Sequence, residues 1–291
     1  MRDIFKSSNH NSLFQSNGFV RFPLLEPEEV SELKALYHEL GLEDKIGYGY
    51  LVGMNDDSIS MRKEMQGKIL EIVSEKIEAS MVNRKLYTAT FMVKLPSDQN
   101  YVPPHQDWTF TENEDEDPSI MIWIALDDVS IENGALGFVK GSHKITKYPR
   151  VFPFPVAQTP VEKFKLELFD QVDYVEMKAG EIVVFDNRTI HASQPNRSKE
   201  LRMAIGLSAY PRDKDLIAYT LKPNSSEKRI SKWKVDEQFF VKYNNPALAQ
   251  AYNNGDDLST EFQLIEEVDY PHGEDWNLNQ TIDWVKTGKN L

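Results

Sequence analysis

The pattern of apolar and polar positions changes its period along this chain. Residues 24–41 and 62–79 both repeat apolar side chains at helical spacing. Pro27 suits the first turn of the earlier segment, and Gly41 suits its C-terminal stop. The first third of the chain is therefore expected to form two amphipathic helices whose apolar stripes face a core.

From about residue 86 the apolar segments become short. Stretches such as "LYTATFMVKL", "SIMIWIALDDV" and "GEIVVFD" are rich in β-branched and aromatic residues and are separated by Gly, Pro, Asn or Asp. Helices followed by many strands predict a helical layer packed against a β-sandwich or jelly roll. We expect one mainly β domain with N-terminal helices: residues 1–85 form the helical layer, residues 86–212 the β core, and residues 213–291 an irregular covering segment with one short helix interrupted before Pro246.

Composition narrows the class of protein. A formal net charge of −13 disfavours a nucleic-acid partner, because such binding relies on clustered Lys and Arg. No apolar run approaches the roughly 18 residues that span a bilayer, so no membrane partner is expected. The first residues lack an apolar signal segment, which favours a cytoplasmic location. With no cysteine in the chain, any metal ion must be held by His, Asp or Glu.

The segment "VPPHQDW" places two metal-ligating residue types two positions apart. In an extended strand, His105 and Asp107 would point to the same face. Alone, this pattern is equally compatible with a hydrogen-bonded surface pair. Downstream, a polar turn after an apolar strand leads to His191. Two histidines and one carboxylate form the triad that is associated with non-haem Fe(II) oxygenases.

The number of protein ligands matters for the chemistry. Three protein ligands on an octahedral metal leave three positions, of which a bidentate 2-oxo acid can fill two and O₂ the third. Oxidative decarboxylation of the 2-oxo acid then supplies the two electrons needed to cleave the O–O bond. Such a co-substrate carries a second carboxylate, for which a guanidinium is the natural bidentate partner. Arg202, at the start of the next strand, is the candidate, and the Ser193 hydroxyl could add a hydrogen bond.

These motifs resemble a known family. "HQDW", followed by "IWIALDDVSIENGALGFVKGSHK", "GEIVVFDNRTIHASQPN" and Arg202, is similar to the phytanoyl-CoA dioxygenase family of Fe(II)/2-oxoglutarate-dependent oxygenases. The resemblance covers about residues 15–212, is densest between 86 and 210, and fades in the tail. It implies a double-stranded β-helix, which agrees with the strand pattern.

The resemblance also assigns residues. It implies that His105, Asp107 and His191 ligate iron, and that Arg202 and Ser193 bind the distal carboxylate of 2-oxoglutarate. Trp123 and Thr90 would line the co-substrate pocket. Halogenating relatives replace the carboxylate ligand with a small residue, so the presence of Asp107 favours hydroxylation.

Several other residues have two interpretations. The family pattern favours a basic residue at Lys94, while an exposed edge-strand lysine is an equally good interpretation. Trp108 and Phe110 either wall a substrate pocket or belong to the core. His143 is expected to be a turn histidine bonded to backbone. The remaining histidines, His10, His38 and His272, are expected to be structural.

Two charged segments suggest opposite substrates. The acidic run "TENEDED" (111–117) could form a lip of the active site that favours a cationic substrate, although a solvated loop is the simpler interpretation. The basic stretch 222–234 is expected to be a solvated loop as well, and its alternative role is to bind an anionic handle.

The sequence thus predicts an Fe(II)- and 2-oxoglutarate-dependent dioxygenase that uses O₂ to hydroxylate an aliphatic C–H bond of a small molecule, such as an amino acid, a natural-product intermediate or an acyl derivative, and releases succinate and CO₂. One alternative is a non-catalytic jelly-roll metal-binding or sensor module. Another is desaturation, epimerisation or cyclisation by the same chemistry, because the outcome depends on substrate position.

Overall fold

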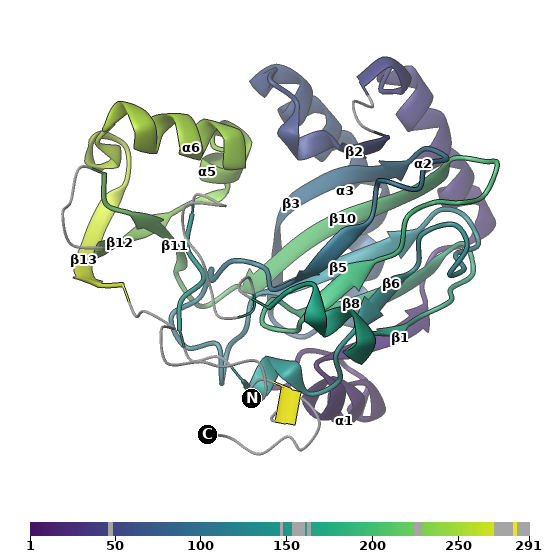
Figure 1. Cartoon of the computed structure of the whole chain (residues 1–291), viewed down its shortest axis with the longest axis horizontal. Helices are drawn as coiled ribbons and strands as arrows, with labels where there is room; N and C mark the ends of the chain where they lie inside the picture. Colours follow the sequence, from purple (N-terminus) through teal and green to yellow (C-terminus); the bar gives the residue numbers. More distant parts are fainter. Residues whose placement is uncertain are drawn as a thin grey trace.

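A computed structural model describes most of the chain (Figure 1). The described residues are 1–45, 49–145, 148–152, 161, 164–223, 229–270 and 282–283. His272 and residues 224–228 of the basic stretch lie outside these ranges. No helix within them is long and apolar enough to cross a membrane.

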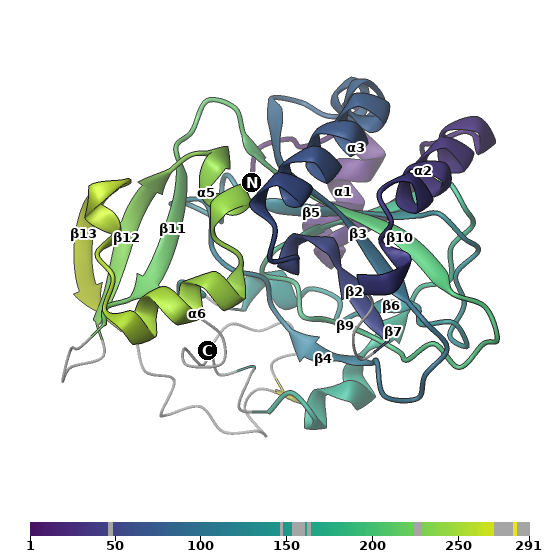
Figure 2. The same ribbon diagram turned by 90° about the horizontal axis from the view of Figure 1, so that it is seen from above.

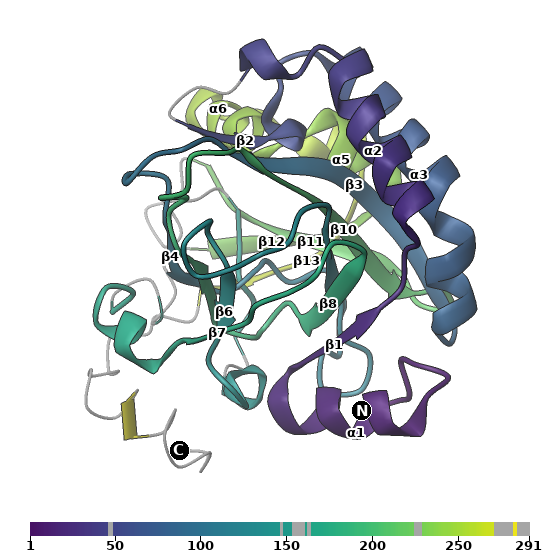
Figure 3. The same cartoon turned by 90° about the vertical axis from the view of Figure 1, so that its right-hand side faces the viewer.

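Two antiparallel sheets form the β core, and they face each other in Figure 3. The larger sheet has the strand order β1-β8-β5-β10-β3-β2, and the smaller has the order β4-β9-β6-β7. The strands are β1 (Phe19–Pro23), β2 (Tyr50–Val52), β3 (Arg84–Lys94), β4 (Val102–His105), β5 (Ile120–Ala125), β6 (Leu136–Phe138), β7 (Asp173–Tyr174), β8 (Glu181–Asp186), β9 (His191–Ser193) and β10 (Arg202–Pro211). The predicted jelly-roll class is confirmed.

Alternating side chains on the larger sheet fill two separate cores. Strand β10 lies between β5 and β3, and every one of its residues is buried, because one face meets the helices and the other meets the smaller sheet. Between the sheets, Phe138 stacks on Phe19 with ring centroids 4.4 Å apart. Ala125 and Ala204 belong to the same buried cluster. A cavity in the β core is lined by Trp123, Phe185 and Gly206 of the larger sheet.

Three helices cover the outer face of the larger sheet: α1 (Ser8–Asn17), α2 (Pro27–Glu39) and α3 (Ile59–Ser80). Figure 3 shows α2 and α3 side by side against β3. Both predicted helices are confirmed, and α3 begins before residue 62 because the Ser58 hydroxyl accepts the Met61 N–H. Helix α1 was not predicted, because Phe14 is its only buried large apolar residue. Short 3₁₀ turns complete this part of the fold at η1 (Glu43–Lys45), η2 (Gly53–Asn55), η3 (Ser142–Lys144) and η4 (Glu167–Gln171).

The chain beyond residue 213 builds a regular unit beside the β core (Figure 1 and Figure 2). Its elements are β11 (Leu216–Leu221), β12 (Arg229–Val235), α5 (Glu237–Lys242), α6 (Asn245–Asn254), η5 (Leu258–Thr260) and β13 (Gln263–Asp269), with sheet order β11-β12-β13. The prediction of an irregular covering segment was therefore wrong. The helix does break before Pro246, but Pro246 then sits in the first turn of α6.

The basic stretch 222–234 is not a solvated loop where it is described. Residues 229–234 belong to β12, with Trp233 and Lys232 both buried. The Trp233 indole N–H donates to Thr220 Oγ1 at 2.8 Å, and Lys232 Nζ donates to Glu112 at 2.5 Å and Glu266 at 3.1 Å. These tertiary partners neutralise a charge that the local sequence leaves unpaired.

Candidate active site

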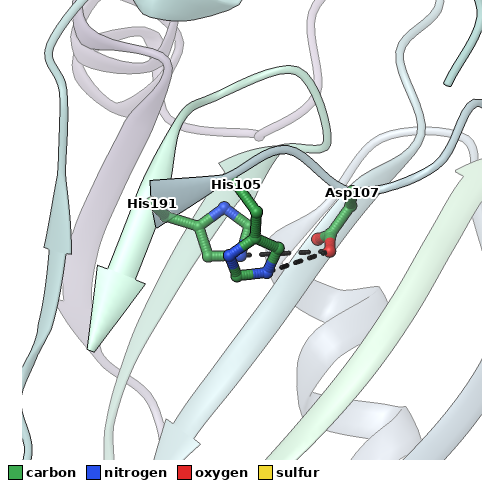
Figure 4. A group of neighbouring side chains, drawn as sticks. All are labelled: His105, Asp107 and His191. Carbon is green, nitrogen blue, oxygen red and sulfur yellow. Dashed lines mark ion pairs between the residues drawn. The ribbon is translucent and has the colours of Figure 1, made fainter. Parts of the chain in front are cut away.

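His105, Asp107 and His191 meet at one end of the smaller sheet (Figure 4). His105 ends β4 and His191 begins β9, and the two are direct cross-strand partners in the antiparallel register. Asp107 follows β4 in an irregular segment, so the strand ends earlier than predicted. Its Oδ1 lies 4.0 Å from His105 Nε2 and 3.9 Å from His191 Nε2. The structure thus brings together the three side chains that the sequence singled out as ligands.

The donor atoms of the triad fit a divalent metal ion. His105 Nδ1 is 2.8 Å from the Pro103 carbonyl and His191 Nδ1 is 2.9 Å from the Thr189 carbonyl. A ring nitrogen that donates to a carbonyl leaves the other nitrogen, Nε2, as a lone-pair donor. Asp107 Oδ2 is buried and has no hydrogen-bond partner among the described residues. The three side chains therefore present two imidazole nitrogens and a carboxylate oxygen at a common point.

Burial keeps His191 in the neutral form that a metal requires. Desolvation, followed by the nearby His105, lowers the pKa of His191 to about 4. Asp107 acts in the opposite direction but does not outweigh burial. At neutral pH no proton has to leave His191 before it can bind a metal ion.

The polar turn between β8 and β9 holds the irregular chain that follows β4 against His191. We call this irregular chain the Asp107 segment. The Asp107 N–H donates to the Asn187 carbonyl at 2.9 Å. Gln106 Nε2 donates to the Arg188 carbonyl, and Arg188 itself is buried against Asp186 at 2.8 Å. Two ligands from distant parts of the chain are thus fixed by one turn.

Arg150 holds the same segment from the other side. Its buried guanidinium donates from Nε to the Asp107 carbonyl at 2.5 Å and from two Nη atoms to Glu114 at 2.5 and 2.9 Å. Its main-chain N–H also donates to Thr109 Oγ1 at 3.0 Å. The sequence did not mark Arg150, because it lies outside any periodic segment.

Replacing Arg150 with methionine is expected to weaken metal binding by about 10- to 100-fold, because the Asp107 main chain loses its charged anchor. The affinity for Co(II), measured by titrating its visible absorption, tests this. Arg197, which is exposed and pairs with Asp98, provides the matched Arg197→Met control. An unchanged Co(II) affinity in Arg150→Met would show that the turn alone positions Asp107.

A cavity of about 450 Å³ opens beside the triad. Arg202, Trp123 and Ser193 all line it. The Arg202 guanidinium carbon lies 5.1 Å from the centroid of the Trp123 ring. Arg202 is 2 % exposed, and its Nε has no hydrogen-bond partner among the described residues. Burial lowers the pKa of Arg202 to about 10, which still leaves the group charged at neutral pH. A buried cation with an unused donor suits a carboxylate.

Lys94 is fully buried, so the interpretation as an exposed edge-strand lysine was wrong. It is the direct cross-strand partner of Arg202, and its Nζ donates to Ser193 Oγ and to the Gln194 carbonyl, both at 2.6 Å. Burial, together with the Arg202 charge, lowers the pKa of Lys94 to about 6. Two basic side chains therefore lie next to each other behind the same cavity wall.

The other predicted lining residues have mixed surroundings. Thr90 lines the cavity, but its Oγ1 already accepts the Met54 N–H at 2.8 Å and anchors η2. Trp108 and Phe110 also line the cavity while packing in an aromatic cluster with the C-terminal unit. The two interpretations of Trp108 and Phe110 were not exclusive, because this cluster is itself the cavity wall.

Comparison with known proteins places this site in a family. The family model described as Phytanoyl-CoA dioxygenase (PhyH) matches residues 50–204, more than half of the chain, and this range includes the triad and Arg202. The chain belongs to the phytanoyl-CoA dioxygenase family. The family resemblance inferred from the sequence is confirmed.

Relatives carry the same family name over part of their length. The chain is 29% identical over 153 residues to a phytanoyl-CoA dioxygenase domain-containing protein 1 homolog from Caenorhabditis briggsae, covering 50% of this chain and 48% of the relative. It is 28% identical over 202 residues to the Dictyostelium discoideum homolog, covering 61% and 72%. The chain thus spans about half the length of the first of these relatives.

Solved structures support the fold of this family member. The carbocyclase SnoK from nogalamycin biosynthesis, described as non-heme and alpha ketoglutarate dependent, aligns with a TM-score of 0.55 at 22% identity, over 72% of this chain and 86% of SnoK. HygX from Streptomyces hygroscopicus aligns with a TM-score of 0.51 at 14% identity, over 71% and 88%. Both confirm the double-stranded β-helix.

In this phytanoyl-CoA dioxygenase family member, the acidic run 111–117 is a loop whose residues 112, 113, 115 and 116 are exposed, as the simpler interpretation predicted, but it is not a free acidic lip. Four of its five carboxylates are paired with basic side chains from distant segments. The pairs are Glu112 with Lys232, Glu114 with Arg150, Asp115 with Arg188, and Asp117 with Arg2 and Lys214. The run therefore clamps the Asp107 segment to the β8–β9 turn and to the C-terminal unit, and these pairs leave little negative charge for a cationic substrate.

His143 is a structural histidine, as predicted. It lies in η3, with its Nε2 3.2 Å from the Gln15 carbonyl, and burial lowers its pKa to about 4. His10 stacks on Phe22, and His38 pairs with Glu43 in the helical layer.

The buried His143 makes stability depend on pH. The unfolded chain takes up a proton below a pKa of about 6.5, whereas folded His143 stays neutral until about pH 4. Stability is therefore lost as pH falls through this window. Between pH 7.5 and pH 5, the wild type should lose about 2 kcal/mol more unfolding free energy than His143→Gln. Urea unfolding at both pH values measures it, with His38→Gln as the exposed control; equal losses in wild type and His143→Gln would contradict the prediction.

Proposed function

We propose that this protein is an Fe(II)- and 2-oxoglutarate-dependent oxygenase that hydroxylates an aliphatic C–H bond of a small molecule. The observation that carries the proposal is the shared cavity: a triad with both imidazole Nε2 atoms turned inward lies beside a buried arginine with an unused donor. A structural metal site has no use for such a cation. HygX, whose fold is similar, is described with nickel and 2-oxoglutarate bound, and SnoK as alpha ketoglutarate dependent.

In this proposal His105, Asp107 and His191 hold the iron. When bound, iron with 2-oxoglutarate and O₂ supplies an oxidant that breaks an aliphatic C–H bond, while 2-oxoglutarate becomes succinate and CO₂. The Pro103 and Thr189 carbonyls keep both imidazoles in the tautomer that leaves Nε2 free. The protein thus orients the reactants rather than exchanging protons with them.

Arg202 would anchor the distal carboxylate of 2-oxoglutarate through its Nε and Nη donors, with Trp123 packed against the guanidinium. Lys94 lies behind Ser193 and holds the Ser193 hydroxyl in place. A carboxylate arriving here would favour the protonated form of Lys94, which burial otherwise disfavours. The co-substrate pocket is therefore matched to an anion, while the aromatic wall opposite excludes water from the reaction.

The proposal is tested by the visible absorption of the anaerobic protein with Fe(II) and 2-oxoglutarate. A charge-transfer band is expected in the wild type and is expected to be absent in His191→Ala, with the exposed His38→Ala as the matched control. A folded wild-type protein without a band would refute the proposal and favour a non-catalytic metal-binding module. Once a substrate is found, a product that has gained one oxygen atom indicates hydroxylation and excludes desaturation, epimerisation and cyclisation.

A further inference from the structure

The cavity continues beyond the triad, away from Arg202, into a space that we call the substrate compartment. Its wall consists of aromatic side chains from the Asp107 segment, residue 152 and the C-terminal unit. These are Trp108, Phe110, Phe152, Phe240 and Tyr243. Trp108 stacks on Phe152 with ring centroids 4.3 Å apart, and Phe110 meets Phe240 edge to face at 4.9 Å. Flat apolar surfaces of this kind bind apolar groups, and rings in particular.

The basic residues beside the substrate compartment already have partners. Arg150 lines it, but its guanidinium is occupied by Glu114 and the Asp107 carbonyl. Lys165 is the other basic residue on this side among the described lining residues, and it also has an interaction partner. A charged substrate group would lose its hydration here without gaining a new partner of opposite charge, which is costly. The compartment therefore favours an uncharged molecule.

Asn187 supplies a polar feature in this wall, directly beside a metal ligand. It is 1 % exposed and lines the cavity, and its carbonyl accepts the Asp107 N–H. Its Nδ2 donates to the Trp108 carbonyl at 3.2 Å and to Ser119 Oγ at 3.3 Å. Its Oδ1 has no hydrogen-bond partner among the described residues.

Flipping the Asn187 amide would let Oδ1 accept from the Ser119 hydroxyl, but it would take the Trp108 acceptor away from Nδ2. A flipped amide would place Oδ1 against the Trp108 carbonyl, so two acceptors would face each other. A buried acceptor without a partner is costly, and buried polar groups in folded proteins are rarely left in this state. The orientation of Asn187 thus points to a donor that arrives with a ligand.

We propose that the substrate is a neutral, largely apolar molecule with an O–H or N–H group that donates to Asn187 Oδ1. This inference rests on the proposed function and names the class of substrate for the same site. The aromatic wall binds the apolar body, and the single hydrogen bond fixes its orientation next to Asp107. The position of one donor group relative to the oxidised carbon is then the feature that the enzyme selects.

Four naphthalene probes of similar shape test the proposal. They are 2-naphthol, which is neutral and a donor; 2-methoxynaphthalene, which is neutral without a donor; 2-naphthoate, an anion; and 2-naphthylmethylammonium, a cation. Anaerobic calorimetry measures their binding to the full chain with Fe(II) and 2-oxoglutarate. We expect 2-naphthol to bind about tenfold tighter than each of the other three. In Asn187→Leu the preference over 2-methoxynaphthalene should vanish, whereas Asn55→Leu, at the exposed rim of the same cavity, should keep it.

The outcomes separate the two proposals. If 2-methoxynaphthalene binds as tightly as 2-naphthol in the wild type, Asn187 does not select a donor and the inference is wrong. It is equally wrong if 2-naphthoate or the ammonium probe binds best, or if no probe binds while the charge-transfer band is present. The wild-type comparison decides even if Asn187→Leu does not fold. Absence of the band itself would instead remove the proposed function.

Discussion

Replacing Asp107 with alanine is expected to reduce 2-oxoglutarate turnover by at least about a thousandfold, because the triad loses its one anionic ligand. Two neutral imidazoles remain, and neither compensates the charge of a divalent ion. Succinate formation in the presence of Fe(II), O₂ and 2-oxoglutarate measures the loss. The effect should be accompanied by weaker Fe(II) binding.

The Asp107→Ala chain should nevertheless fold. Asp107 Oδ2 has no partner among the described residues, and the hydrogen bonds that hold the segment use the main chain of Asp107. Thermal unfolding of the metal-free variant should therefore resemble that of the wild type. Asp98→Ala removes an exposed carboxylate and is the matched control for turnover. Turnover in Asp107→Ala close to that of the wild type would show that the metal is held elsewhere.

Replacing Arg202 with methionine is expected to raise the dissociation constant of 2-oxoglutarate by about 100-fold. The guanidinium is buried and lines the cavity. Its loss therefore removes the charge-assisted pair with the carboxylate, and water does not replace it. The charge-transfer band, titrated with 2-oxoglutarate at fixed Fe(II), measures the change. Fe(II) binding itself should change little, because Arg202 is not among the three ligating side chains.

Arg197→Met, a change of the same kind at an exposed arginine of the preceding turn, is the control for the Arg202 experiment. An unchanged affinity for 2-oxoglutarate in Arg202→Met would transfer the anchoring role to Lys94, its cross-strand neighbour. The variant Lys94→Met would then show the loss that Arg202→Met lacked.

The residues of the site could be predicted because they are marked by order along the chain. The markers are a His-x-Asp pair, a distant histidine after an apolar strand, and an arginine on the following strand, in this order. Each of them can be recognised from its local pattern. Strand pairing then explains the meeting of the histidines, since His105 lies directly opposite His191. Likewise, apolar periodicity predicts α2 and α3, because their buried faces follow the helical repeat.

What could not be predicted depends on partners that are distant in sequence. Lys94 has no local mark of burial, and its environment is set by Ser193 and Arg202 on other strands. Four carboxylates of residues 111–117 pair with cations from distant segments of the chain. Lys232 of β12 is likewise buried because it pairs with Glu112 and Glu266. In each case the partners that set the environment of a charged residue come from distant parts of the chain: hydrogen-bond acceptors for Lys94, and ion pairs for the other residues.

The direct pairing of His105 with His191 has a consequence for how the protein folds. These two strands lie far apart in the sequence, and such non-local pairing is slow to form. A slip of one residue in the register would turn one imidazole to the opposite face. A tight metal site thus exists only in the completed native topology, so metal ions stabilise that state selectively and slow its loss. A refolding experiment that is monitored by metal uptake would report the last step of assembly. It would not report the hydrophobic collapse of the chain that precedes this step.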